Sequence, residues 1–354
     1  SDLDDSLSHP RLEFVCTVCE EVGMEGATGI DVSMLKGKKL LNMDSEEEGV
    51  MLASCAGGCR ADVKLPVERE TVSGTKLTVS LSGLTGGHSG SEIDKGRGNA
   101  NTLMSRLLRD ASAPVAIASI DGGRKDNAIP RECTAQIIVA PDEAAAVKAS
   151  IEQAAAEIAE EFKASDPDLK LTVSEETDCS ESAISAKDSA RVIALIEALP
   201  NGIIRMSREI DKLVETSLNL GVLKSDDAAV TLRYAVRSSV GVAKKSLKNQ
   251  LVCIAGAFAA EVTFEGDYPA WEYKKDSKLR EDMVRIFEEM YGKKPTVEAI
   301  HAGVECGLLS GKIEGLDCIS MGPDMYDIHT TEERLSISSA KRSYEYILRV
   351  IACK

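Results

Sequence analysis

Apolar and polar positions alternate with two rhythms along the middle of the chain, and each rhythm predicts one kind of element. Alternation at every second residue is typical of strands, whereas apolar residues three and four positions apart are typical of helices. Strands are predicted at 75–82, 115–120, 133–139, 169–174, 215–224, 228–236 and 261–265. Helices are predicted at 99–110, 142–163, 187–199 and 242–259. The order repeats after the polar stretch 175–182, which predicts two ferredoxin-like halves on one antiparallel sheet.

Both ends of the chain carry a different pattern. Short apolar runs read as buried strands at 12–18, 39–43 and 316–321, and apolar stripes predict helices at 277–291 and 338–352. We therefore expect an α/β fold whose doubly wound catalytic domain is discontinuous, built from residues 1–57 and 267–354. An α+β lid domain of two ferredoxin-like halves, residues 58–266, would be inserted between these two parts.

Size and charge narrow the class of protein. A chain of 354 residues with 43% hydrophobic content is long enough for two domains with their own cores. The net charge of −16 argues against a nucleic-acid partner, which would need a basic surface. No apolar run approaches the roughly 18 residues of a membrane span, and the polar start SDLDDSLSHP does not resemble a signal peptide. We expect a cytoplasmic protein without a membrane partner.

The ten cysteines have no framework spacing, which suits a reducing compartment. The pairs Cys16-x2-Cys19 and Cys55-x3-Cys59 allow a structural zinc site as an alternative. Cys16 and Cys19 lie on or beside a predicted strand, however, where an odd offset sends two side chains to opposite faces. Buried, reduced thiols that act as small hydrophobes are the preferred interpretation.

Acidic residues follow the predicted strands at the ends of the chain. They are Glu20 and Glu21 after strand 12–18, Asp44 after strand 39–43, and Asp324 and Asp327, with His329, after strand 316–321. Ligands of open α/β sheets bind beyond the carboxyl ends of the strands. Carboxylates and an imidazole suit a dinuclear Zn²⁺ or Mn²⁺ site, so the sequence points to a metal hydrolase. The plain alternative is a set of solvated acidic loops, which we expect for Glu46, Glu47 and Glu48.

Seven motifs, in order, carry a resemblance to a known family. They are CEEVGMEGA, NMDSEEEG, CAGG, GLTGGHSGSEI, NAIPRE, IHAGVECGL and GPDMYDIHTTEE. The series resembles that of the zinc-dependent aminoacyl-histidine dipeptidases (peptidase D-like, Xaa-His dipeptidases) and spans nearly the whole chain. The resemblance implies hydrolysis of dipeptides such as β-alanyl-histidine with two zinc ions, and a homodimer formed through the lid. In dimeric relatives, the edge of the lid near strand 75–82 and helix 99–110 meets its twin.

The resemblance also implies a role for each matching residue. Glu20 would be the general base, Glu21 and His329 would bind one metal, and Asp44 would bind the other. His88, in a glycine-rich bend, would steady the oxyanion in its own or the partner's site. Asn127, in NAIPRE, and Arg237 are candidates for the substrate carboxylate, which the guanidinium fork matches. Arg237 lies in VRSS at a predicted strand end and matches the family more loosely, with an exposed surface arginine as the alternative. His301 and Glu305 would line the pocket at a helix start.

Two metal-site motifs of the family do not occur in the sequence. Relatives carry a His-x-Asp motif and an Asp-Asn-Gly motif whose Asp bridges the metals, and neither is present. After His329, Thr330-Thr331-Glu332-Glu333 stands where relatives usually have Ser-Pro-Asp-Glu. We expect that the N-terminal segment of the family is missing, through truncation, proteolysis or a natural short form, and that this chain alone is inactive. The alternative function is a non-catalytic dimerising or binding module that retains part of the metal site.

Overall fold

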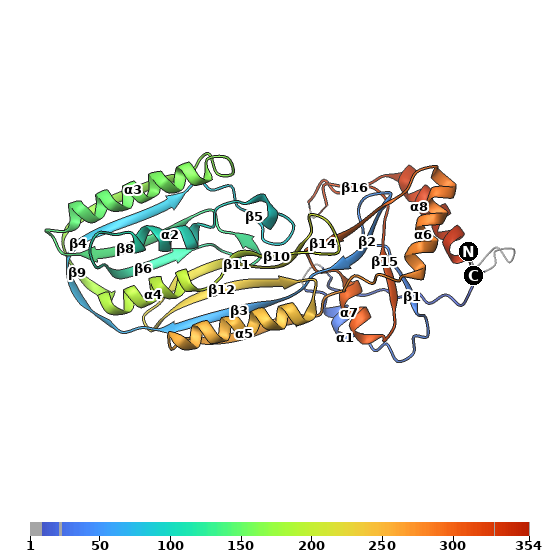
Figure 1. Cartoon of the computed structure of the whole chain (residues 1–354), viewed down its shortest axis with the longest axis horizontal. Coiled ribbons are helices and arrows are strands. Elements are labelled where there is room, and N and C mark those ends of the chain that lie inside the picture. Colours follow the sequence, from blue (N-terminus) through green and yellow to red (C-terminus); the bar gives the residue numbers. More distant parts are fainter. Residues whose placement is uncertain (1–8, 21–22, 329, 354) are drawn as a thin grey trace.

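The computed structural model describes residues 9–20, 23–328 and 330–353. Two sheets, each with its own helices, lie at opposite ends of an elongated molecule (Figure 1). The larger sheet has nine strands and the smaller has four. Two segments connect the sheets, one between β2 and β3 and one after β13. An antiparallel β-bridge between Cys55 and Trp271 joins these two segments. A Cβ at Gly57 would lie 2.4 Å from the Ala270 nitrogen, so only glycine fits where the two segments run side by side.

The nine-stranded sheet is antiparallel at every pairing, in the order β13-β3-β12-β11-β6-β8-β4-β9, with β10 paired to β11. Its strands are β3 (Gly57–Pro66), β4 (Arg69–Ser82), β6 (Ala116–Gly122), β8 (Cys133–Val139), β9 (Lys170–Ile184), β10 (Gly202–Met206), β11 (Val214–Ser225), β12 (Ala229–Ser238) and β13 (Glu261–Tyr268). One half consists of β4, β6, β8 and β9, and the other of β3, β11, β12 and β13. When the strands of each half are numbered along the chain, they lie side by side in the sheet in the order fourth, first, third and second. The prediction of two ferredoxin-like halves is confirmed.

Four helices cover one face of this sheet and form its core. They are α2 (Ala100–Arg109), α3 (Ala144–Phe162), α4 (Ala186–Ala198) and α5 (Gly241–Ala257). The Asn99 side chain caps α2 by accepting from the Asn101 and Thr102 backbone N–H groups. All four helices match predicted ranges to within two residues at each end. The domain limits 58–266 stay a prediction, although β3 and β13 place the ends of the large sheet close to them.

The four-stranded sheet has the order β1-β15-β2-β14. Its strands are β1 (Lys39–Asn42), β2 (Val50–Cys55), β14 (Thr296–Ile300) and β15 (Asp317–Ser320). Strands β1 and β15 are parallel, as are β2 and β14. Ile319 of β15 packs on one face with α6 (Lys278–Tyr291) and α8 (Ile337–Ile351), while Cys318 packs on the other face near α7 (Glu305–Lys312). Helices on both faces agree with a doubly wound arrangement.

Short elements complete the described chain. They are α1 (Glu25–Gly29), β5 (Gly87–His88), the 3-10 turn η1 (Ile93–Lys95), β7 (Ala128–Ile129), β16 (Met325–Tyr326) and β17 (Arg334–Leu335). Among the described helices, none has both the length and the apolar character needed to cross a membrane.

The predicted strand 12–18 is wrong. These residues lie outside any strand, and Phe14 and Val18 are 81% and 69% exposed. A strand exists only through hydrogen bonds to a neighbour, and the path of the small sheet ends at β1 and β14 without including this segment. An apolar run alone cannot tell whether such a neighbour is available.

Two expectations about the lid are also corrected. The polar stretch 175–182, expected to separate the halves, belongs to β9 and pairs with β4. Strand 75–82 cannot meet a twin at a sheet edge, because β4 has β8 on one side and β9 on the other. Among the described strands, the path of the large sheet ends at β9 and β13 instead.

The cysteines divide between surface and core. Cys16 and Cys19 are exposed, so the expectation that they are buried was wrong. Cys55 packs beside Trp271, whereas Cys59 packs in the core of the large sheet. Because Cys55 and Cys59 belong to different cores, the structural zinc interpretation is not supported.

Candidate active site

His88 lies in the small ribbon that β5 forms with β7. Gly86 and Gly87 precede it with φ of 66° and 137°, which other residues rarely adopt. The backbone N–H groups of Gly90 and Ser91 both point to His88 Nδ1, at 3.3 and 3.1 Å. Because a backbone N–H can only donate, Nδ1 accepts, and the proton of the neutral ring is on Nε2. Burial and then the charge of Arg237 lower the pKa of His88, while Glu92 raises it. The net lowering of the pKa favours the neutral form of the ring.

Asn127 stands next to the same ribbon. Its carbonyl accepts from the Ser89 backbone N–H at 2.9 Å, which fixes the NAIPRE loop against the His88 bend. The Asn127 side chain is exposed. The two sequence motifs that hold His88 and Asn127 are therefore neighbours in space.

Arg237 is the second component of the site. It lies near the end of β12, is 9% exposed, and stands opposite Gly58 of β3 and Ser217 of β11. One terminal nitrogen donates to the Tyr268 hydroxyl at 3.5 Å, while Nε has no partner. Among the described residues, no carboxylate lies within 4.0 Å of its guanidinium group. A buried guanidinium without an acid is costly and suits an anionic ligand.

His301 comes from the loop between β14 and α7 and meets the lid. Its Nε2 is 2.7 Å from the Ser217 hydroxyl, and the ring is 5% exposed. Burial first, and the charge of Arg237 second, lower the pKa of His301 to about 3. The ring is therefore neutral at physiological pH.

Gly90 shows how closely these groups converge. A Cβ at this position would lie 2.5 Å from the His301 carbonyl oxygen, 3.0 Å from His88 Cε1 and 3.2 Å from Arg237 Nε. The structure thus brings His88 of one lid half, Arg237 of the other half, and His301 of the smaller sheet's region into one cluster. This cluster is the candidate active site.

Glu20, Asp44 and Glu305 come from segments around the smaller sheet. Glu20 is half-buried, and its carbonyl accepts from the Gly23 and Met24 backbone N–H groups in the turn before α1. Glu305 is the first residue of α7 and accepts from the Thr17 hydroxyl at 2.6 Å. Asp44 is exposed just beyond β1, and is near enough to contribute to the raised pKa of Cys306, whose main causes are a hydrogen bond with Cys318 and burial.

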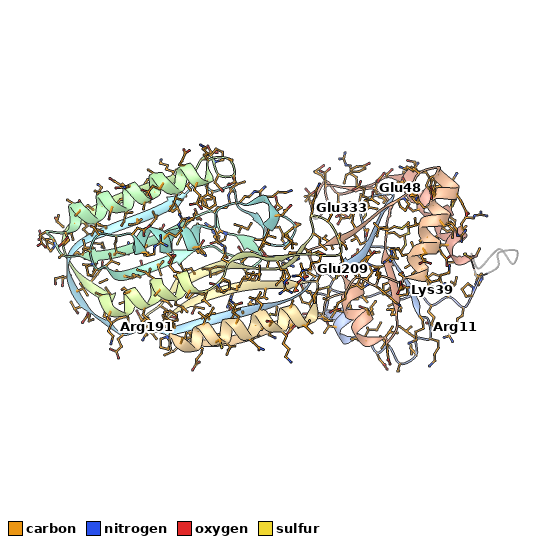
Figure 2. The ribbon with its side chains drawn as sticks, in the orientation of Figure 1. Arg11, Lys39, Glu48, Arg191, Glu209 and Glu333 are labelled. Carbon is orange, nitrogen blue, oxygen red and sulfur yellow. The ribbon has the colours of Figure 1, made fainter. Side chains whose placement is uncertain are left out.

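Asp324, Asp327 and Glu48, further acids near the strand ends, also have structural partners. Asp324 accepts from the Glu48 backbone N–H at 2.8 Å, and Asp327 pairs with Arg334 at 2.6 Å. Glu48, labelled in Figure 2, receives both arms of the Arg342 guanidinium, which lowers the pKa of Glu48. These acids are therefore used within the protein.

Glu21 and His329, two of the three predicted metal ligands, lie outside the described residues. Within the described part of the chain, no group of three or more His, Cys, Asp and Glu side chains is arranged to hold a metal ion. The described residues thus offer Glu20 and Asp44 as acids of the right type but do not form a complete site.

Comparison with known proteins decides the family. The chain is 34% identical to the cytosol non-specific dipeptidase of Escherichia coli (strain K12) over 340 residues, which cover 95% of the chain and 70% of the relative. The chain belongs to the M20 dipeptidase family. Its structure also matches that of aminoacylhistidine dipeptidase from Vibrio alginolyticus with a TM-score of 0.88 at 32% identity, covering 95% of this chain and 69% of the other.

A model of the peptidase dimerisation domain matches residues 79–166 of this M20 chain. That range holds β6, β8, α2 and α3, most of one ferredoxin-like half, together with His88 and Asn127. Ser217, Ser89 and Tyr268 were not predicted from the sequence. Ser217 follows two other polar residues, Glu215 and Thr216, in a predicted strand, and the sequence gives no signal that sets it apart from them.

Proposed function

We propose that this M20 chain binds and hydrolyses dipeptides, with Xaa-His dipeptides such as β-alanyl-histidine as the preferred class. The observation that carries the proposal is Arg237, a buried guanidinium with no acid beside it among the described residues, flanked by two neutral imidazoles. A dipeptide presents one carboxylate, which a guanidinium binds through two parallel hydrogen bonds. The resemblance to an aminoacylhistidine dipeptidase supports histidine as the C-terminal residue.

Each site residue then has a role near the bound dipeptide. Arg237 holds the C-terminal carboxylate, with Asn127 from the neighbouring loop as a second contact. His88 donates from Nε2 to the oxygen that gains charge when the carbonyl is attacked, the interaction that contributes most when a donor is placed in advance. His301 and Glu305 line the pocket. His88, Arg237 and His301 meet within one chain, which supports catalysis by His88 in its own subunit.

We also propose Glu20 as the general base, with two Zn²⁺ ions held in part by Glu21, Asp44 and His329. Metal in such a site supplies a Lewis acid for the scissile carbonyl and lowers the pKa of water. Glu20 would take the proton of the attacking water and pass it to the leaving amine. The M20 membership of the chain supports a metal cofactor in general. A cytoplasmic location is proposed by analogy with the cytosol dipeptidase.

A comparison of two substrates tests the proposed function. β-Alanyl-histidine should be hydrolysed much faster than β-alanyl-histidinamide, because only the acid offers a carboxylate to Arg237. The assay uses the protein supplied with zinc, and with any further segment that its gene encodes. Equal rates for acid and amide would contradict the role of Arg237, and no hydrolysis of any dipeptide would favour the non-catalytic module.

Zinc binding by this polypeptide alone is expected to be weak and substoichiometric. Glu21 with His329 on one ion, and Asp44 on the other, give fewer than the three protein ligands that catalytic zinc requires. Metal analysis after extensive dialysis measures the zinc content of the unmodified chain and of Asp44→Asn. Asp31→Asn, which changes an exposed acid outside the site, is the control for Asp44→Asn. Two tightly held zinc ions per chain would contradict the expectation.

A homodimer formed through the lid is expected to persist in this polypeptide, because the dimerisation-domain match lies wholly inside it. The open strands β9 and β13, rather than β4, are available for pairing across a two-fold axis. Sedimentation at micromolar concentration should show a defined dimer, distinct from polydisperse aggregate. A clean monomer would remove the dimer from the proposal and leave catalysis by His88 in its own chain untouched.

A further inference from the structure

The contact between Ser217 and His301 joins the two parts of the molecule inside the site. Ser217 belongs to lid strand β11, and His301 belongs to the loop between β14 and α7. The hydroxyl and Nε2 are 2.7 Å apart, and both residues are almost fully buried, with 1% and 5% exposure. Ser217 stands directly opposite Arg237 in the pairing of β11 with β12. Opposite residues of antiparallel strands project to the same face, so Ser217 approaches His301 from beside Arg237.

The direction of this hydrogen bond depends on which imidazole nitrogen carries the proton. Among the described residues, the Ser217 hydroxyl has no other hydrogen-bond partner than His301 Nε2. If Nε2–H donated, the buried serine hydrogen would have no acceptor and His301 Nδ1 would have no donor. If Ser217 donates, its hydrogen is used and the imidazole proton is on Nδ1. Each arrangement leaves one donor of the pair unused, the serine O–H in the first and Nδ1–H in the second, so the surroundings of the ring decide between them.

The surroundings of the ring favour a proton on Nδ1, because the Ser217 hydroxyl occupies Nε2 and a second acceptor acts on the ring. The Val214 backbone carbonyl acts on His301 in the direction opposite to burial and raises its pKa, as an acceptor near an imidazole N–H does. No atom of the described residues completes a hydrogen bond at Nδ1, however. Nδ1–H is thus the donor of His301 that remains for a bound molecule.

We propose that Ser217 is a positioning residue whose hydroxyl donates to His301 Nε2, keeps the imidazole proton on Nδ1 and holds the ring beside Arg237. The carboxylate subsite then contains one permanent cation, Arg237, and one neutral N–H donor, His301. The role in substrate binding rests on the proposed function, whereas the tautomer of His301 does not depend on it.

The tautomer can be measured directly on the full chain. The protein has four histidines, so selective ¹⁵N-histidine labelling gives simple spectra in which couplings between ring nitrogens and ring protons identify the protonated nitrogen. His→Asn variants assign the signals one by one. At pH 7 we expect His301 as the Nδ1–H form in the unmodified chain. In Ser217→Ala, the Nε2–H form should become populated, because the donor that excluded it is gone.

The matched control is Ser238→Ala. Ser238 is fully buried on the neighbouring strand β12, and its hydroxyl pairs with Thr216 and with the Val240 backbone rather than with His301. Both variants remove one buried hydroxyl from the same sheet, and because Ser238 makes more hydrogen bonds, a general loss of stability should be at least as large in Ser238→Ala. Only Ser217→Ala should change the His301 signals. Titration with unlabelled β-alanyl-histidine should show affinity about 2- to 10-fold weaker in Ser217→Ala, the usual loss for one hydrogen bond, and unchanged affinity in Ser238→Ala.

The outcomes separate this inference from the proposed function. A His301 ring protonated on Nε2 in the unmodified chain overturns the inference, even if Ser217→Ala fails to fold. The inference is also overturned if folded Ser217→Ala gives the same His301 signals as the unmodified chain. If the tautomer changes as expected but the unmodified chain binds no dipeptide, the positioning by Ser217 stands and the proposed substrate fails.

Discussion

Replacing Arg237 by methionine is expected to lower kcat/KM for β-alanyl-histidine by about 10²- to 10³-fold, mostly through KM. The carboxylate would lose two charge-assisted hydrogen bonds, each contributing about 1.5–3 kcal/mol, in part offset by water that enters the space. The carboxylate takes no part in the bond change, so the contact exists in both the ground state and the transition state, and its loss raises KM. Because only Cα separates the carboxylate from the leaving nitrogen, the contact also positions the scissile bond, and a smaller loss of kcat is expected as well. Steady-state kinetics of the active dipeptidase measure both.

Arg233→Met is the matched control for this variant. Arg233 lies four positions earlier on β12 and forms a bidentate pair with Asp62, away from the site. Its loss should leave kcat/KM near that of the unmodified enzyme. β-Alanyl-histidinamide gives a second check. Because this compound has no carboxylate, Arg237→Met should hydrolyse it nearly as well as the unmodified enzyme does. An equal loss on acid and amide would mean that Arg237 acts through the fold rather than through the carboxylate.

The topology of the lid explains how residues from distant parts of the sequence reach Arg237. One ferredoxin-like half is inserted after the first strand of the other, and the two are joined where β6 pairs with β11. His88 comes from the inserted half and Arg237 from the enclosing half. Asn219 of β11 donates to the Asp126 and Ala128 carbonyls, which ties the Asn127 loop to the enclosing half. The continuous sheet therefore positions both groups without requiring a second subunit.

The lid was predictable from the sequence because its signals are local. The alternation of 133–139 gives β8 with the same bounds, and the spacing in 99–110 gives α2, whose apolar residues Leu103, Met104 and Leu107 are buried. Each element carries its own face pattern, and the repeat of the order indicates two similar halves. Where the pattern is polar, as in 175–182, the prediction failed, because pairing with β4 decided the structure.

The site was predictable only in part. His88 and His301 were recognised from motifs and Arg237 from a looser match at a strand end, but their proximity depends on tertiary contacts that no spacing encodes. Ser217 illustrates the limit: a serine in a strand has no chemical signal until His301 is seen 2.7 Å away. The segment 12–18 fails for a related reason, since a strand requires a partner as well as an apolar run.

Glu20→Gln is expected to lower turnover of the active dipeptidase by roughly 10²- to 10⁴-fold, the usual contribution of a general acid–base group. The amide is close to isosteric but cannot accept a proton from water or deliver one to the leaving amine. The proposed ligands Glu21, Asp44 and His329 are unchanged, so metal content should stay the same. Kinetics and metal analysis on one preparation test both statements.

Glu25→Gln is the matched control for Glu20→Gln. Glu25 is an exposed acid in the first turn of α1, five positions away, and it has no proposed role in the reaction. It should retain near-normal turnover, so that a loss confined to Glu20→Gln reports chemistry rather than charge. If Glu20→Gln kept near-normal turnover, another residue would be the base. If it lost its metal, Glu20 would be acting as a ligand, and the assignment of Glu20 and Glu21 would have to be exchanged.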